Sequence, residues 1–185
     1  MKGVKTMLYY GPKELAFGSR TVRKNTLIIA QEIPENKYGF KPVPEYRSVT
    51  QLLTHIAFAY RFQYQFHALE QRGSFEGFDF PAFMKNILAE ESRPRDKAQI
   101  IDLLKNEGEK WSAWVEGLSE EFLSQIVEMP KDSTPATKSR FEMILSVKEH
   151  EMHHRGQLML IERLVGVVPH LTREREARMA QMNQK

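Results

Sequence analysis

Three of the six histidines in this chain lie within five residues of one another, at positions 150, 153 and 154. His150 and His154 are four residues apart, so in a helix they share one face, with their Cβ atoms about 6 Å apart. Two imidazoles at that separation can reach one metal ion at roughly 2.1 Å each. The pair therefore predicts part of a metal site, and a third ligand has to come from elsewhere in the chain.

The segment His150–His154 also has the form H-E-x-x-H, in which two histidines bind zinc and the glutamate between them activates water. The extended form of this motif requires Gly and His where this chain has Gln157 and Leu160. Glu174 and Glu176 lie downstream, but in a run of alternating charges, where an acidic residue is expected by chance. Peptide hydrolysis is therefore the less favoured interpretation.

The composition excludes several classes of function. The chain has no cysteine, which rules out disulfides, thiolate ligands and a cysteine nucleophile, and leaves imidazole and carboxylate as metal ligands. The net charge is only +3, and the densest basic run, Arg173–Arg178, alternates with acidic residues, so no nucleic-acid partner is expected. No apolar run approaches the ~20 residues that cross a bilayer, and the first residues lack a secretory leader, so a cytoplasmic protein without a membrane partner is expected.

Four amphipathic segments indicate an all-α fold, a four-helix bundle with one long crossover between the second and third helices. The helices are predicted over about 12–32, 48–71, 95–117 and 139–166, within a single domain that spans residues 1–185. Ser48 and Ser139 each precede Gln or Glu by three residues, the form of a capping box that opens a helix. No segment alternates in the way that predicts a β-strand.

Two further segments complete the chain. The connection 73–94 is rich in phenylalanine. Asp79 as a cap and Pro81 in the first turn predict a short helix over about 80–90 within it. Long connections inside a domain often form lids or pocket walls, whereas the alternative is that the rings cap the core, which is favoured here. A short helix is expected after Ser119, and the charged C-terminal tail is expected to be peripheral or frayed.

The candidate third ligand is His55, the one polar residue on the apolar face of the second helix. A lone histidine at such a position is usually a core residue bonded to a carbonyl group. The pair at positions 150 and 154 changes this interpretation, because buried neighbouring imidazoles need partners and one cation satisfies them together. Helical bundles build metal sites from inward side chains on facing helices in this way.

The chain resembles the DinB/YfiT-like family of metal-binding four-helix bundles over nearly its whole length. The resemblance depends on Arg47–Ala57, on His150 with His154-Arg155-Gly156-Gln157-Leu158, and on the approach Lys37–Pro42. It implies a three-histidine site at His55, His150 and His154, a divalent metal such as zinc or nickel, and a homodimer. Members with known activity are similar in using the metal with low-molecular-weight thiols, as S-transferases or as a thiol-dependent isomerase.

Three functions fit this site. The first is a thiol S-transferase acting on small electrophiles, which needs no cysteine of its own; the second is a metal-dependent hydrolase; the third is a non-enzymatic interaction module stabilised by metal. No catalytic residue is assigned. Glu151 is expected either to accept a hydrogen bond from a ligand imidazole or to be solvated. His153 is expected behind the ligands or in packing, and Arg155 in a surface or interface ion pair, with Arg61 as another possible substrate contact.

Overall fold

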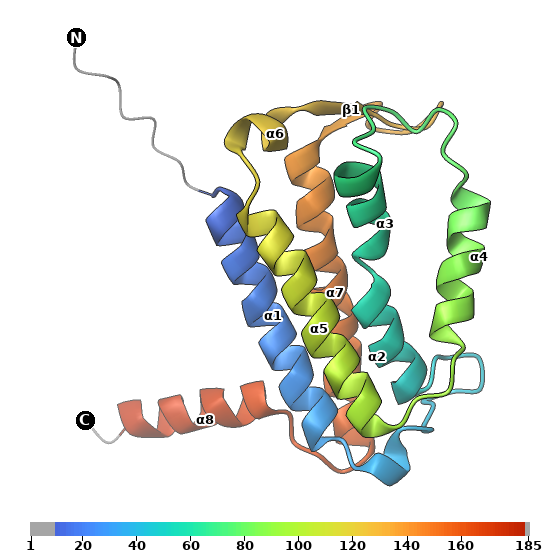
Figure 1. Ribbon diagram of the computed structural model, residues 1–185. Helices are drawn as coiled ribbons and strands as arrows, with labels where there is room; N and C mark the ends of the chain where they lie inside the picture. Colours follow the sequence, from blue (N-terminus) through green and yellow to red (C-terminus); the bar gives the residue numbers. More distant parts are fainter. Residues whose placement is uncertain (1–9, 184–185) are drawn as a thin grey trace.

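Four amphipathic helical segments pack side by side in the computed structural model, which describes residues 10–183 (Figure 1). Residues 1–9, on which the expected lack of a leader depends, lie outside the described residues. The all-α four-helix bundle predicted from the sequence is confirmed. Its members are α1 (Pro12–Glu32), then α2 (Val49–Phe58) continued by α3 (Arg61–Tyr64) and the π-helical η2 (Gln65–Leu69), then α5 (Lys97–Glu116) and α7 (Arg140–Leu164).

Both predicted capping boxes open helices of the bundle. Ser48 Oγ accepts a hydrogen bond from the Gln51 amide at 3.2 Å, and Gln51 Oε1 accepts one from the Ser48 amide at 2.9 Å. The corresponding distances between Ser139 and Glu142 are 3.2 and 2.7 Å. Each box satisfies amide groups that the first turn of a helix leaves without partners, so these two boundaries are encoded locally.

The second helix differs from its prediction, because it is interrupted after α2 and ends in a π-helical turn. Within this π-helical turn, Phe66 and His67 are both buried. His67 Nδ1 accepts a hydrogen bond from Arg140 Nη1 at 2.7 Å at the start of α7. This interruption therefore fixes the end of the second helix against the last one.

Two clusters of buried side chains hold the four helices together. One surrounds Ile29, Leu52, Leu104 and Leu158, which come one from each helix of the bundle. The other contains Leu15, Tyr60, Trp111 and Ile144 and lies further along the same helices. Since burial of each large apolar side chain contributes about 1.5–3 kcal/mol, these clusters determine how α2 and α7 face each other.

The crossover from the second to the third bundle helix carries α4 (Phe80–Glu91), which stands outside the bundle beside α2 and α3 (Figure 1). Asp79 caps it by accepting a hydrogen bond from the Ala82 amide at 2.9 Å. Phe83 is the one residue of α4 that is buried. The helix is therefore attached to the bundle by few side chains, and its inner face is available to line pockets.

The expectation that the chain has no strand is wrong. Residues Ile126–Glu128 (β1) and Thr137–Ser139 (β2) form an antiparallel pair, with Val127 opposite Lys138. Each strand has only three residues, too few to show the alternation by which a strand is predicted. The pair follows the short helix α6 (Glu120–Ser124) and leads the chain into α7.

The C-terminal tail forms a helix, α8 (His170–Met182), which extends away from the bundle (Figure 1). The turn before it contains Gly166 at φ 87°, a left-handed conformation that favours glycine, and Pro169. Between the described residues 10 and 183, no helix combines the length and the apolar character needed to cross a bilayer.

Candidate metal site

Three imidazoles from two helices converge inside the bundle. His55 lies on α2, and His150 and His154 lie one turn apart in α7. The Nε2 atom of His150 is 3.2 Å from His55 Nε2 and 3.1 Å from His154 Nε2, and one ligand atom from each ring lies within 4.8 Å of the others. His154 is buried and the other two rings are half-buried. The structure thus brings together the three residues that the sequence singled out.

Two of these rings are oriented by acceptors on their outer nitrogens. His55 Nδ1 lies 2.8 Å from Glu91 Oε1, and His154 Nδ1 lies 2.7 Å from Gln157 Oε1. A carboxylate and an amide oxygen only accept hydrogen bonds, so each Nδ1 carries the ring proton. In the neutral rings, Nε2 of His55 and of His154 therefore presents a lone pair toward the centre of the cluster.

The cluster fits a divalent cation better than a set of hydrogen bonds. His150 Nε2 faces both lone pairs, but a neutral ring has at most one proton there to donate, and His150 Nδ1 is buried without a hydrogen-bond partner among residues 10–183. Three nitrogens bound to one tetrahedral ion at about 2.1 Å stand roughly 3.4 Å apart, close to the separations from His150. The donor set is imidazole alone, which suits zinc, nickel or copper rather than magnesium or calcium.

The environment of His150 and His154 favours their neutral forms. Burial, followed by the neighbouring His154 and His55, lowers the pKa of His150 to about 4. Burial also lowers the pKa of His154, against the opposing effect of the hydrogen bond that His154 donates to Gln157 Oε1. Arg47 adds to both shifts, which places its positive charge near the cluster. Neutral imidazoles are the form that binds metal, so the lowered pKa values of His150 and His154 favour metal binding.

Glu151, the glutamate of the H-E-x-x-H segment, is held in a buried ion pair on another side of α7. Arg23 Nε and Nη2 bind its two oxygens at 2.8 and 2.9 Å. The same guanidinium donates to the carbonyl oxygens of Leu104 at 2.6 Å and Ile56 at 3.3 Å. Glu151 is therefore neither solvated nor an acceptor for a ligand imidazole, and a general base at this position is excluded by its bidentate partner.

The sequence pattern did not reveal that Arg23 is buried, although a glycine inside the third bundle helix, Gly108, was a possible sign of a close contact. Gly108 lies within a helix interior, where glycine is unfavourable. A Cβ atom at this position would stand 2.8 Å from Arg23 Cγ, so the glycine makes room for the arginine. The ion pair links α1 to α7 across the core, one residue away from the ligand His150.

The remaining candidates lie around the cluster or away from it. Exposed His153 Nε2 is 3.0 Å from Gln157 Nε2, so Gln157 joins the ligand ring of His154 to the surface. Arg61 binds Glu107 at 2.9 Å and covers the Phe58 ring. Burial lowers the pKa of His170 at the start of α8, and the positive charges of Arg173 and Arg155 lower it further.

The carboxylate that orients His55 was not recognised from the sequence, because Glu91 belongs to the crossover rather than to a bundle helix. Among the described residues, the group of candidate metal ligands contains neither Glu174 nor Glu176, the acidic residues considered for a zinc-protease site. His67 is engaged with Arg140, away from this group.

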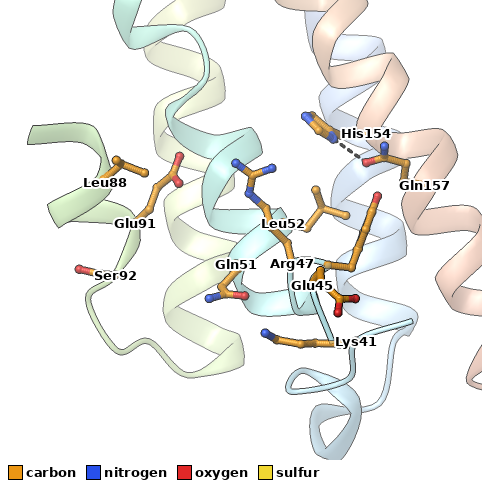
Figure 2. A pocket seen from close by; sticks show the side chains of 11 residues that line it. Lys41, Glu45, Arg47, Gln51, Leu52, Leu88, Glu91, Ser92, His154 and Gln157 are labelled. Carbon is orange, nitrogen blue, oxygen red and sulfur yellow. Dashed lines mark hydrogen bonds between the residues drawn. The ribbon is translucent and has the colours of Figure 1, made fainter. Parts of the chain in front are cut away.

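Two pockets border the cluster. A polar pocket of about 620 Å³ reaches His154 and includes Lys41, Arg47 and Gln51 in its lining. Figure 2 shows the Arg47 side chain between Glu91 of α4 and His154 of α7. A second pocket of about 380 Å³ reaches His55 and His150 and is mostly apolar. The connection takes both expected roles: Phe75 and Phe78 pack against a buried core cluster, as favoured from the sequence, whereas Phe80 and Phe83 line this pocket.

Comparisons with known proteins agree with this arrangement. The sequence model of a family described as the DinB superfamily matches residues 20–158. A DinB-like protein of Bacillus subtilis, YjoA, has a similar structure, with a TM-score of 0.60, 22% identity, and coverage of 83% of this chain and 92% of that one. YfiT of Bacillus subtilis, described as a probable metal-dependent hydrolase with an unusual four-helix bundle topology, gives a TM-score of 0.65 at 14% identity, covering 90% and 94%. No curated protein matches the sequence.

Proposed function

Because the chain belongs to the DinB superfamily, we propose that it is a divalent-metal-dependent enzyme whose ion is bound by His55, His150 and His154. The observation that carries the proposal is the convergence of the three Nε2 atoms, two of which present lone pairs to a third that can donate only one proton. Zinc or nickel is the proposed ion, since both accept three imidazoles.

The residues around the site support catalysis rather than a purely structural ion. Three protein ligands leave further coordination positions to a substrate, and both pockets open at the cluster. A bound divalent ion supplies Lewis acidity and lowers the pKa of a water or thiol that it coordinates. Glu91 and Gln157 keep the ligand rings in one tautomer, and the apolar wall excludes water from one side.

The first candidate reaction is transfer of a low-molecular-weight thiol to a small electrophile. Lys41 lines the polar pocket that reaches His154, where Glu45 and Glu91 also lie, and its positive charge is a suitable partner for a carboxylate group of such a thiol. In the reaction a sulfur–carbon bond forms, the leaving group departs with its electron pair, and the thiol proton passes to solvent. The absence of cysteine agrees with a thiol that is supplied as a cosubstrate.

Hydrolysis is the second candidate, supported by the structural similarity to YfiT and its description as a probable metal-dependent hydrolase. This reaction needs a water nucleophile and a residue that removes its proton. Glu151 is bound by Arg23 and Glu91 by His55, so neither carboxylate is free for that role. The site therefore gives less support to hydrolysis than to thiol transfer.

Elemental analysis of the purified protein tests the metal site. The wild-type chain is expected to bind one zinc or nickel ion, and His55→Ala is expected to lose tight binding. His153→Ala is the matched control, because His153 is exposed and its side chain bonds to Gln157 alone in the part of the chain that the structure describes; this variant is expected to retain the ion. Stoichiometric metal in His55→Ala would contradict the proposed ligands.

Activity assays then separate the reactions. One panel combines different thiols with a generic electrophile, and a second contains esters and amides without thiol. Turnover is expected in the first panel only. Turnover of esters alone would favour the hydrolase. Metal binding without turnover in either panel would favour a non-enzymatic module.

We also propose a homodimer that forms through α7. Met152, Leu160 and Leu164 are exposed and recur, together with exposed Gly156, at intervals of four residues along one face of this helix. Such a stripe allows close approach of a second helix. Light scattering is expected to give twice the mass of the chain for the wild type and a monomer for Leu160→Glu, and a monomeric wild type would contradict the proposal.

A further inference from the structure

We propose that the apolar pocket between α2, α4 and α7 binds the aromatic body of an organic anion whose acidic group pairs with Arg47. The inference rests on the proposed function and deepens it, since the ligand is the substrate that would meet the metal site. It assigns the pocket, the class of compound and the residue that recognises its charge.

The walls of the pocket are suited to an aromatic ring system. Its apolar lining includes Phe58, Phe62, Phe80, Phe83, Met84 and Ile87. The Phe62 ring meets those of Phe80 and Phe83 edge to face, with centroids 5.8 and 5.7 Å apart. Rings in this arrangement offer both faces and edges to a further ring, and a volume of about 380 Å³ lies in the range of small-molecule sites.

One end of the pocket is chemically different from its walls. His55 and His150 line it there, and Arg47 and Glu91 lie beside them. A molecule whose apolar body fills the pocket therefore presents its polar end to the cluster of imidazoles. Ala59, at the end of α2, also lines the pocket and has a small side chain.

The charge at this end favours an anion. Within residues 10–183, Arg47 takes part in no hydrogen bond or ion pair, whereas Glu91 beside it is occupied by His55. Arg47 also lines the polar pocket on the other side, where it lies between α4 and α7 (Figure 2). An unpaired guanidinium next to an apolar cavity provides a binding partner for a carboxylate or sulfonate.

A matched pair of fluorescent probes tests both parts of the proposal. Anilinonaphthalene sulfonate carries an aromatic body and an anionic group, and phenylnaphthylamine has the same rings without the charge. The wild-type protein is expected to bind one sulfonate probe, roughly five-fold more tightly than the neutral probe. Arg47→Gln is expected to abolish that preference while leaving the neutral probe unaffected.

Variants that fill the pocket locate the binding site. Ala59→Leu is expected to lower the affinity for both probes by about ten-fold or more, because the larger side chain leaves no room for their rings. Met84→Trp is a second filling variant, on the lightly packed α4, and does not disturb the bundle core. Ala113→Leu, on the exposed surface of α5, is the matched control and is expected to bind as the wild type does.

The outcomes are decisive when metal content is measured in parallel. Unchanged probe binding in both Ala59→Leu and Met84→Trp would show that the probes do not bind in this pocket. Equal affinity of the wild type for the two probes would contradict the pairing of Arg47 with the anionic group. Probe binding with the expected variant effects in a protein that binds no metal would overturn the proposed function and leave this inference standing. Metal binding without probe binding would overturn this inference and leave the proposed metal site standing.

Discussion

The hydrogen bond between Glu91 and His55 is expected to determine how tightly the site holds its ion. Glu91 Oε1 is 2.8 Å from His55 Nδ1, and the side chains are only 12% and 19% exposed. A charged acceptor roughly doubles the strength of such a bond relative to a neutral one, from about 1 to about 2 kcal/mol. Glu91→Gln keeps the shape and loses about 1 kcal/mol, or roughly five- to ten-fold in metal affinity.

Glu91→Ala removes the acceptor altogether and is expected to weaken metal binding by up to about 100-fold, the upper range for residues that orient a ligand imidazole. Competition with a chromophoric chelator at neutral pH measures the affinity directly. Glu90→Gln is the matched control, because it removes the same charge from the adjacent residue of α4. Glu90 pairs with Arg93 at 2.7 Å near the surface and is expected to leave the affinity within about two-fold of the wild type.

Two results would refute this reasoning. If Glu91→Gln and Glu91→Ala bind the ion as tightly as the wild type, the carboxylate does not orient the ligand. If Glu90→Gln weakens binding as much as Glu91→Gln, the effect comes from the overall charge of α4 rather than from the bond to His55. Hydrogen exchange adds an independent measurement, since loss of the bond is expected to speed exchange in α4 and not in α1.

Three further predictions follow from buried charges and from the ion. Arg23→Ala leaves Glu151 buried without its partner and is expected to lower the free energy of unfolding by about 3–5 kcal/mol in urea titrations, whereas a loss under 1 kcal/mol would contradict the structure. Burial raises the pKa of Glu162 from 4.5 to about 7, so folding favours the protonated acid and stability declines as pH rises through that interval. Glu162→Gln is therefore expected to raise the free energy of unfolding by about 1–2 kcal/mol in urea titrations near pH 8 and not near pH 4. An equal effect at the two pH values would contradict the raised pKa of Glu162. Chelation at neutral pH is expected to lower the melting temperature of the wild type but not of His55→Ala, and equal shifts would argue against the triad.

Local features of the sequence determined much of the fold. The capping boxes at Ser48 and Ser139 and the apolar repeats predicted the helices of the bundle to within a few residues. Their signals are visible because a helix is stabilised by neighbours three and four residues apart. The same spacing placed His150 and His154 on one face of α7.

Tertiary structure decided what the sequence left open. Arg23 and Glu151 are separated by 128 residues, and His55 and Glu91 by 36, so no local pattern marks either pair. The strands at Ile126–Glu128 and Thr137–Ser139 are stabilised by pairing across the chain rather than by their own residues.

The sequence by itself thus determined the four helices and the residue types that can bind an ion, because both depend on spacing along one helix. Only the packing of α1, α2, α4 and α7 decided that Glu151 is engaged by Arg23, that Glu91 orients His55, and that Arg47 lies between two pockets. These contacts join segments remote in the chain, and the burial that makes them strong exists only after the core has formed.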